Sequence, residues 1–244
     1  NWFKIDALLE KLNAARAEGV WLHSDRYPYV AAGTDLDIVL PEWASAGGNP
    51  VILKTLRDPA LRLRVEAELN ASERTWSEVM VGGCWSDTTR PYQGRCIAEL
   101  CEEFGVSPGE IVCRIIDADD CRTGAFFFGM SEENLRRIYA QPWIMPGSDA
   151  SLRAPWGVLG IDWPHPRAYG TMARFYRTLT GGDGKAIASR EETIRRMTSL
   201  PAHAFGIDQR GVIRCGAYAD LVVLNESAFA DRATYEAPHQ FCTG

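Results

Sequence analysis

The chain has 244 residues, a formal net charge of −6 and hydrophobic residues at 46% of its positions, the composition of an ordinary globular protein. Its length suits one large α/β domain, alone or with a small satellite domain. An acidic chain with a pI near 5.3 offers no basic surface for nucleic acid, and no apolar run approaches the roughly 18 residues that span a bilayer. We therefore expect partners that are neither nucleic acids nor membranes.

The cysteines indicate a reducing compartment. All seven are scattered along the chain without a C-x-x-C pair. A chain of this size does not need a disulfide framework, so we predict free thiols and no zinc cluster built from them. The first residues open directly into a helical pattern, without a signal peptide, and we expect a cytoplasmic protein.

The first predicted helix covers about residues 5–15, where apolar side chains repeat at helical spacing, and Gly19 follows as its terminator. Residues 20–23 are then predicted to form a strand that ends at His23. A histidine at the end of a strand is a candidate metal ligand, because neutral imidazole suits zinc. The alternative is a histidine that is hydrogen-bonded within its loop.

Residues 31–110 give a less regular pattern. A helix is predicted after Asp58, where proline follows the capping residue, and a second one around Ile97 ends at Gly105. Ser107 begins a capping box with proline at the first helical position, which predicts a third helix. The pattern does not show which of these residues face a pocket.

The next section reads as a strand, a helix and a strand. Residues 123–129 form an apolar run, Ser131 caps the helix, and residues 143–146 form a second apolar run. This order is a β-α repeat and predicts a parallel sheet. The aromatic residues 126–128 are more typical of a core than of a binding surface.

Asp149 comes at the end of the second of these strands, after a turn of small residues. If the strand belongs to an α/β barrel, its carboxyl end is where catalytic groups gather. Asp149 could there accept a proton from a metal-bound water. The alternative is that Asp149 caps the loop that follows, since short polar residues are common in turns.

A long loop then leads to Arg167, at the start of a helix predicted for about residues 168–179. Long loops without secondary structure of their own tend to be functional in compact domains. The planar guanidinium of Arg167 could bind a substrate carboxylate. The alternative is a structural ion pair with one of the many acidic residues.

The last part of the chain changes character. A capping box at Ser189 begins another helix, and residues 210–225 are predicted to form a β-turn-β segment. We place a domain boundary near Phe205.

Several motifs, in order along the chain, resemble one family. They are Asp25-Arg26-Tyr27-Pro28-Tyr29, Gly147-Ser148-Asp149, His165-Pro166-Arg167-Ala168-Tyr169-Gly170-Thr171, Arg196-Met197-Thr198-Ser199-Leu200-Pro201-Ala202, Gly216-Ala217-Tyr218-Ala219-Asp220-Leu221-Val222-Val223 and Asp231-Arg232-Ala233-Thr234-Tyr235. Together they resemble the N-acyl-D-amino-acid deacylases, or D-aminoacylases, of the amidohydrolase superfamily. The resemblance runs over nearly the whole chain.

The resemblance implies an α/β fold in which a metal-dependent (β/α)8 barrel carries a small β-sandwich made from both chain ends. It implies a partial barrel in residues 1–205, with an insertion at about 31–110, and a partial β-sandwich segment in residues 206–244. The expected activity is zinc-dependent hydrolysis of the amide bond of N-acyl-D-amino acids, which releases a carboxylic acid and a D-amino acid.

The resemblance also assigns roles to single residues. Asp149 resembles the last-strand aspartate that activates the metal-bound water and moves its proton. Arg167 is similar to the arginine that binds the substrate's α-carboxylate, and Tyr27, in the matching motif near the start, is expected to contact substrate. His23 lies where a histidine ligand of zinc is expected, with the register against Asp25 left open.

The chain also departs from the family pattern. The family's H-x-H pair, its third-strand cysteine or glutamate and its fifth-strand histidine have no counterpart here. We therefore expect the C-terminal portion of such an enzyme, completed by a longer gene product, a second chain or a homo-oligomer. One rival is a non-catalytic fragment or partner subunit. Another is a cyclic-amide hydrolase of the dihydroorotase or hydantoinase type, against which the His165-Pro166-Arg167 element argues.

Overall fold

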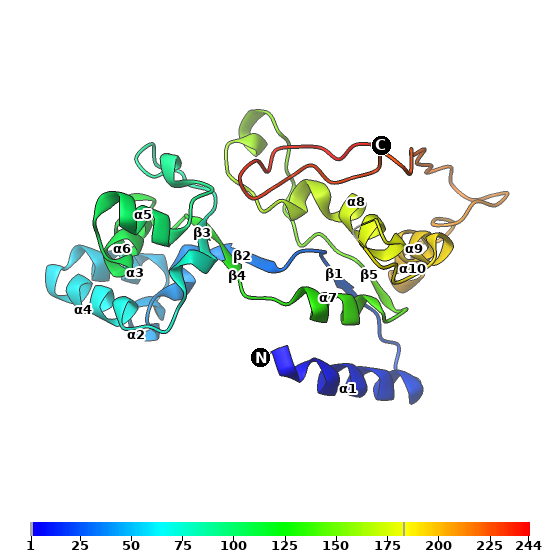
Figure 1. The fold of residues 1–244 in the computed structure, drawn as a ribbon, viewed down its shortest axis with the longest axis horizontal. Coiled ribbons are helices and arrows are strands. Elements are labelled where there is room, and N and C mark those ends of the chain that lie inside the picture. Colours follow the sequence, from blue (N-terminus) through cyan, green and yellow to red (C-terminus); the bar gives the residue numbers. More distant parts are fainter. Residues whose placement is uncertain (1, 183) are drawn as a thin grey trace.

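The structure, a computed structural model, describes residues 2–182 and 184–244. Figure 1 shows an elongated molecule with a helical part at one end and a looser part at the other. We call residues 31–128 the lobe, and residues 2–30, 129–182 and 184–244 the strand-pair region.

The lobe is built on a three-stranded antiparallel sheet in the order β2-β4-β3. Five helices cover it (Figure 1). Its elements in chain order are β2 (Ala31–Asp35), α2 (Glu42–Ser45), α3 (Asn49–Arg57), α4 (Pro59–Asn70), β3 (Val79–Val81), α5 (Ile97–Phe104), α6 (Pro108–Ala118) and β4 (Gly124–Phe128).

The lobe encloses the larger hydrophobic core of the described residues. Its innermost side chains are fully buried aliphatic residues, namely Leu36, Ile52, Leu56, Val65, Ile97, Leu100, Ile111, Ile115 and Ile116. Helices α4 and α6 approach closely at Gly109, where a Cβ atom would collide with the backbone oxygen of Glu66. Glycine is therefore required there for this packing.

The strand-pair region contains α1 (Ile5–Ala17), β1 (Ser24–Arg26), α7 (Glu132–Tyr139), β5 (Ile144–Pro146), α8 (Arg167–Thr180), α9 (Arg190–Met197) and α10 (Ser199–Ala204). Strands β1 and β5 pair in parallel, with Ser24 opposite Ile144 and Arg26 opposite Pro146. A smaller core lies beside this pair, where Tyr139 of α7 packs edge-on against Phe175 of α8. None of the helices that the structure describes is long and apolar enough to cross a membrane.

The helix starts follow the local sequence. The hydroxyls of Ser107, Ser131 and Ser189 each accept a hydrogen bond from the backbone N–H three residues further on, as an N-cap residue does. Gly105 ends α5 in the left-handed conformation, at φ 63°. These predicted helix limits are confirmed.

Two predicted strands differ from the structure. The first lies at Ser24–Arg26 instead of residues 20–23, because Val20 and Trp21 are exposed and do not enter a sheet. Strand β4 does not pair in parallel with β5, as the β-α repeat predicts. Both edges of β4 are occupied by antiparallel partners, β2 and β3, so the parallel partner of β5 is β1.

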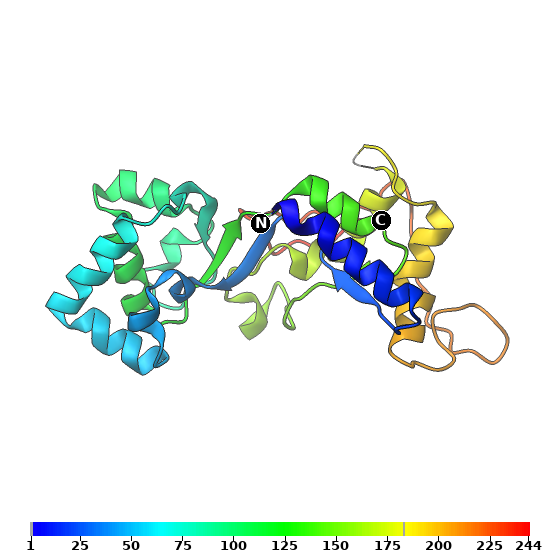
Figure 2. The same cartoon turned by 90° about the horizontal axis from the view of Figure 1, so that it is seen from below.

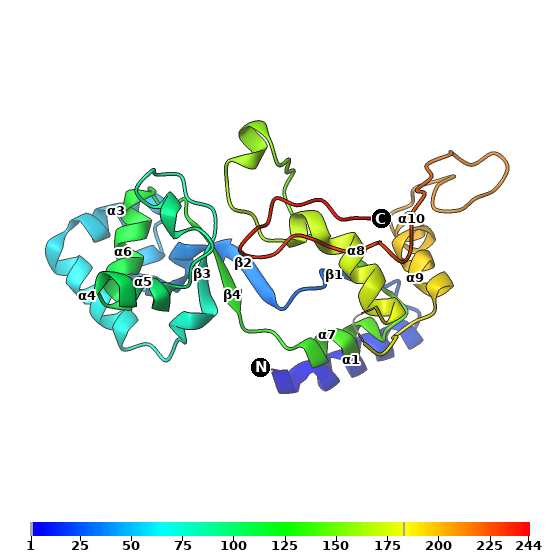
Figure 3. The ribbon, with the colours of Figure 1, turned by 45° about the horizontal axis from the view of Figure 1, so that its top comes forward.

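The lobe contains the section expected as an insertion, residues 31–110, and extends beyond it, because α6 and β4 belong to the same core. The β-turn-β segment predicted for residues 210–225 does not form a strand. A two-stranded ribbon without a packing face is marginally stable, and Figures 2 and 3 show this segment projecting past α10. The following residues return along α8, where Ala230 and Thr243 form an isolated bridge.

Candidate active site

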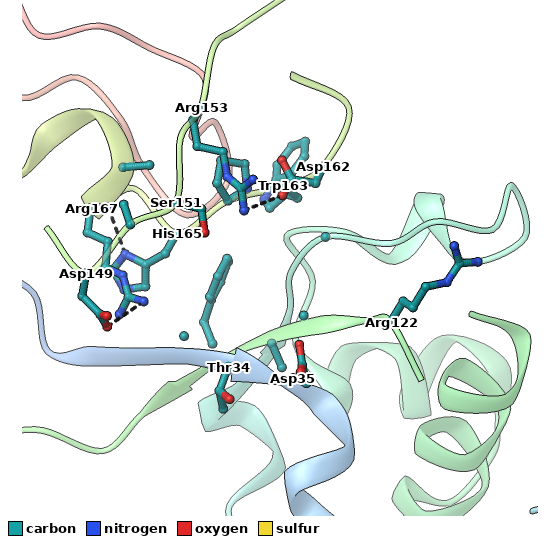
Figure 4. Close-up of a pocket in the computed structure, with 18 of the residues that line it drawn as sticks. Thr34, Asp35, Arg122, Asp149, Ser151, Arg153, Asp162, Trp163, His165 and Arg167 are labelled. Carbon is teal, nitrogen blue, oxygen red and sulfur yellow. Dashed lines mark hydrogen bonds and ion pairs between the residues drawn. The ribbon is translucent and has the colours of Figure 1, made fainter. Parts of the chain in front are cut away.

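A cavity of about 380 Å³ opens between the lobe and the strand-pair region. Residues 33–35 of β2 and 124–126 of β4 line it on the lobe side, and Asp149 and Arg167 line the other side (Figure 4). Asp149 comes three residues after the end of β5, so the cavity lies at the carboxyl ends of the two parallel strands. This is the edge of an α/β sheet where ligands and catalytic groups gather.

Asp149 is held in an unusual backbone conformation. Its φ angle is 47°, in the left-handed region that residues other than glycine seldom adopt. Gly147, two residues earlier, lies so close to β1 that a Cβ atom there would displace the carboxylate of Asp25. The turn therefore directs the Asp149 carboxylate, which is 68% exposed, toward the cavity and Arg167. Such strain is typical of functional sites.

Arg167 is the first residue of α8 and its side chain is only 10% exposed. Its Nη2 lies 2.9 Å from Oδ2 of Asp149 (Figure 4). The guanidinium also lies over the ring of Tyr27, 4.6 Å from its centroid. The structure thus brings together Asp149, Arg167 and Tyr27, three of the four predicted site residues.

His165 is part of this site, although the sequence pattern alone does not single it out. The imidazole is buried, its Nδ1 accepts a hydrogen bond from the backbone N–H of Arg167 at 3.0 Å, and its Nε2 lies 3.1 Å from the oxygen of Ala31. Burial, assisted by the positive charge of Arg167, lowers the pKa of His165 to about 3. The imidazole is therefore neutral at physiological pH.

His23 lies elsewhere. It precedes β1, whereas Asp149 follows β5, so the two residues are at opposite ends of the parallel pair. His23 lines a separate pocket together with Trp21 and His203, and its buried Nδ1 has no hydrogen-bond partner among the described residues. Burial and the nearby Arg16 lower the pKa of His23. Asp25, the alternative to His23 as the expected ligand, is on β1 itself.

The described residues contain no group of three or more histidine, cysteine, aspartate or glutamate side chains that could hold a metal ion. The residues present therefore do not by themselves fit zinc. The ligand role of His23 stays a prediction.

The two interpretations of Arg167 coincide in this structure. Its ion-pair partner is Asp149, the candidate catalytic residue, and not a remote structural acid. The sequence also did not reveal the lobe side of the cavity, where Trp85 contributes. Arg122 lines the same side (Figure 4). Trp85 comes from a loop in residues 31–110, the section whose pattern was weak, and Arg122 comes from the connection between α6 and β4. The signals for His165 in the sequence were its place in the His165-Pro166-Arg167 element and its position shortly before the predicted helix, and neither assigned it a role.

Comparison with known proteins finds relatives over nearly the whole chain. Residues 133–241 match the amidohydrolase family. An N-acyl-D-glutamate deacylase of Alcaligenes xylosoxydans xylosoxydans is 30% identical over 240 residues, which cover 98% of this chain and 39% of that protein. A D-aminoacylase of the same organism is 32% identical over 160 residues, which cover 66% of this chain and 30% of that protein.

Solved structures of deacylases also match this chain. An N-acyl-D-glutamate deacylase from Bordetella bronchiseptica, complexed with zinc and a phosphonate inhibitor, matches with a TM-score of 0.69 and 28% identity over 99% of this chain and 41% of that one. A D-aminoacylase structure matches over the same shares at a TM-score of 0.68 and 28% identity. The chain has an amidohydrolase-type fold of mixed helices and strands, and spans about two fifths of these relatives. The closed barrel, the β-sandwich and the domain limits stay predictions.

Proposed function

We propose that this chain, whose residues 133–241 belong to the amidohydrolase family, carries part of the active site of a zinc-dependent N-acyl-D-amino-acid deacylase. The family predicted from the motifs is confirmed, and the relatives it matches are N-acyl-D-amino-acid deacylases. The observation that carries the proposal is the ion pair of Asp149 with the buried Arg167 at the carboxyl ends of the parallel strands. The reaction would release a carboxylic acid and a D-amino acid.

Arg167 is suited to bind the substrate's α-carboxylate. Its side chain is nearly buried, so its charge is poorly screened by water and interacts strongly with an anion. The ring of Tyr27 lies under the guanidinium and adds a cation–π contact that helps to hold it. Arg167 and Tyr27 thus form the proposed substrate-binding pair.

Asp149 is suited to move a proton. Its carboxylate is exposed to the cavity and can accept a proton from an attacking water and pass it to the leaving amine. In the free protein this carboxylate is paired with Arg167. A bound substrate carboxylate would compete for the same guanidinium, so substrate binding would free Asp149 for proton transfer.

Zinc is the expected cofactor, because a structural relative holds it together with an inhibitor. The described residues offer no three-ligand set for it, so its ligands would come mostly from other parts of the protein. We therefore assign no step of the reaction to the ion here. The same observation favours the second candidate for the chain by itself, a non-catalytic part that needs a second chain or a longer polypeptide.

The proposal is tested in the full-length protein that contains this chain, with N-acyl-D-amino acids as substrates. Asp149→Asn should lower kcat by about 10²- to 10⁴-fold, the usual contribution of a proton-transferring side chain. Arg167→Ala should mainly raise KM, and should have little effect on an N-acyl amine that lacks the α-carboxylate. Arg64→Ala, which removes an arginine from the far side of the lobe, is the matched control.

Three outcomes would contradict the proposal. Turnover like that of the unaltered protein in Asp149→Asn excludes the proton-transfer role. Absence of hydrolysis in a full-length protein that binds zinc stoichiometrically supports the non-catalytic reading. Hydrolysis of a dihydroorotate or hydantoin in preference to N-acyl-D-amino acids favours the cyclic-amide rival.

A further inference from the structure

His165 connects three segments of the chain at one buried point. Nδ1 accepts from the backbone N–H of Arg167 at the start of α8, and Nε2 lies 3.1 Å from the oxygen of Ala31, the first residue of β2. Tyr235 belongs to the C-terminal tail, the residues after α10, where the chain returns along α8. Its hydroxyl lies 3.3 Å from the same Nε2. One side chain thus touches the lobe, the helix that bears Arg167, and the tail.

The hydrogen-bond partners fix the tautomer. The N–H of Arg167 can only donate, so Nδ1 must be unprotonated. The oxygen of Ala31 can only accept, so Nε2 must carry the proton of the neutral ring. Both ring nitrogens are therefore used, and rotation of the ring by half a turn would lose both bonds.

The surroundings keep the ring in this orientation. The rings of Tyr29, Phe126 and Tyr235 lie edge-on to the imidazole, with centroids 5.0–5.3 Å away. The imidazole also serves the start of α8, because the first N–H groups of a helix have no partner within the helix. His165 satisfies one of them at the residue whose side chain faces the cavity.

We propose that His165 is a positioning residue that holds Arg167 in place for the substrate's carboxylate. Nδ1 fixes the backbone of Arg167, while Nε2 ties the start of α8 to β2 of the lobe. The inference rests on the proposed function, in which Arg167 binds that carboxylate. It adds a residue that does not touch substrate and acts only through Arg167.

Two substitutions separate the two ring nitrogens. In His165→Asn the side-chain oxygen can lie near the place of Nδ1 and still accept from the N–H of Arg167, while the bond to Ala31 is lost. In His165→Gln the longer side chain can still reach the oxygen of Ala31, while the acceptor for Arg167 is lost. If Nδ1 positions Arg167, the glutamine variant should be the more impaired.

Steady-state kinetics of the full-length protein test this expected difference between the two variants. For an N-acyl-D-amino acid, His165→Gln should raise KM roughly 10- to 100-fold, the scale of a small misplacement of a binding group. His165→Asn should recover most of this loss. An N-acyl amine without the α-carboxylate should show nearly equal kinetics in all three proteins. Equal losses in both variants, or the same loss with the substrate that lacks the carboxylate, would overturn the proposal.

A second measurement does not depend on activity. In ¹⁵N NMR spectra of the unaltered protein, His165 should show protonated Nε2 and unprotonated Nδ1 at pH 7, with its signal assigned by its absence in His165→Asn. A protonated Nδ1 would overturn the inference even if the deacylase activity is present. The expected tautomer in a protein without deacylase activity would refute the proposed function but retain the hydrogen bond to Arg167.

Discussion

The lobe and the strand-pair region bury their apolar side chains to different extents. In the lobe, both edges of β4 pair with neighbouring strands, and helices enclose a core of fully buried aliphatic side chains. In the strand-pair region, two strands of three residues pair in parallel, an arrangement that usually needs cover on both faces. Apolar side chains of its tail stay in solvent, with Ile213 91% and Val223 96% exposed.

This difference teaches where the site gets its geometry. Asp149 and Arg167 belong to the less enclosed region, whereas the opposite wall of the cavity belongs to the lobe. His165, hydrogen-bonded to β2, joins the two. A well-packed lobe can therefore act as a fixed wall against which the polar groups of the other region are positioned.

The largest expected effect is in the core of the lobe. Leu100→Ala, at a fully buried position, should lower the free energy of unfolding by about 2–5 kcal/mol, through lost burial and the cavity left behind. Leu63→Ala, the same change at a leucine that is 67% exposed, should change it by less than about 0.5 kcal/mol. Urea unfolding measures both. Equal effects would mean that the lobe is not the enclosed unit described here.

The next largest effect on stability is expected at the buried carboxylate of Asp119. It accepts hydrogen bonds from the hydroxyls of Thr89 and Thr123 and from the N–H groups of Trp85 and Ser86, and so holds the loop that carries Trp85 to the cavity. Asp119→Asn replaces one acceptor by a donor and should destabilise by about 1–3 kcal/mol.

The pH dependence of the same site has a definite sign. Burial alone would raise the pKa of Asp119, but the hydrogen bonds outweigh it and the pKa is lowered from 3.8. The stabilisation is therefore complete above pH 3.8 and is lost as the pH falls through the lower folded value. The loss of unfolding free energy in Asp119→Asn, measured by urea unfolding, should therefore become smaller as the pH falls below 3.8. The control Asp87→Asn, at a side chain 91% exposed, should show no deficit at either pH. A deficit in Asp119→Asn that does not depend on pH would contradict the assignment.

What the sequence could predict follows the range of the interactions involved. The caps at Ser107, Ser131 and Ser189 depend on residues three positions apart and were predicted correctly. The pairing of β4 depends on β2 and β3, short strands far away in the chain without a regular pattern, and was predicted wrongly.

The candidate site shows the same limit. Asp149 was identified from a strand end and Arg167 from the end of a long loop, and the motif resemblance supported both. Their ion pair, however, depends on how α8 packs across that loop. The position of His23 relative to the first strand depends on where that strand begins. A strand over residues 20–23 puts His23 at the carboxyl end, whereas the strand at Ser24–Arg26 puts it before the start. The periodicity of so short a strand cannot fix its ends.

A third prediction concerns the joint between the two regions. Because the pKa of His165 is about 3 in the folded protein and 6.5 ordinarily, the unfolded chain binds a proton that the folded one does not between these values. Stability should therefore fall as the pH drops below 6.5, by up to about 1.4 kcal/mol per pH unit from this residue. His165→Asn should flatten the slope between pH 6.5 and 5 in urea unfolding. A slope that is the same in both proteins would contradict the buried neutral imidazole.

The smallest effect is expected in the tail of the strand-pair region. Because Val223 is almost completely exposed, Val223→Lys removes no buried contact and should change the free energy of unfolding by less than about 0.5 kcal/mol. Val65→Thr, a milder change at a valine that is fully buried in the lobe, should cost more, since it buries an extra hydroxyl. If Val223→Lys instead destabilises as strongly as Val65→Thr, the exposed apolar segment must be covered in solution, and the difference between the two regions would lie in their partners and not in their own packing.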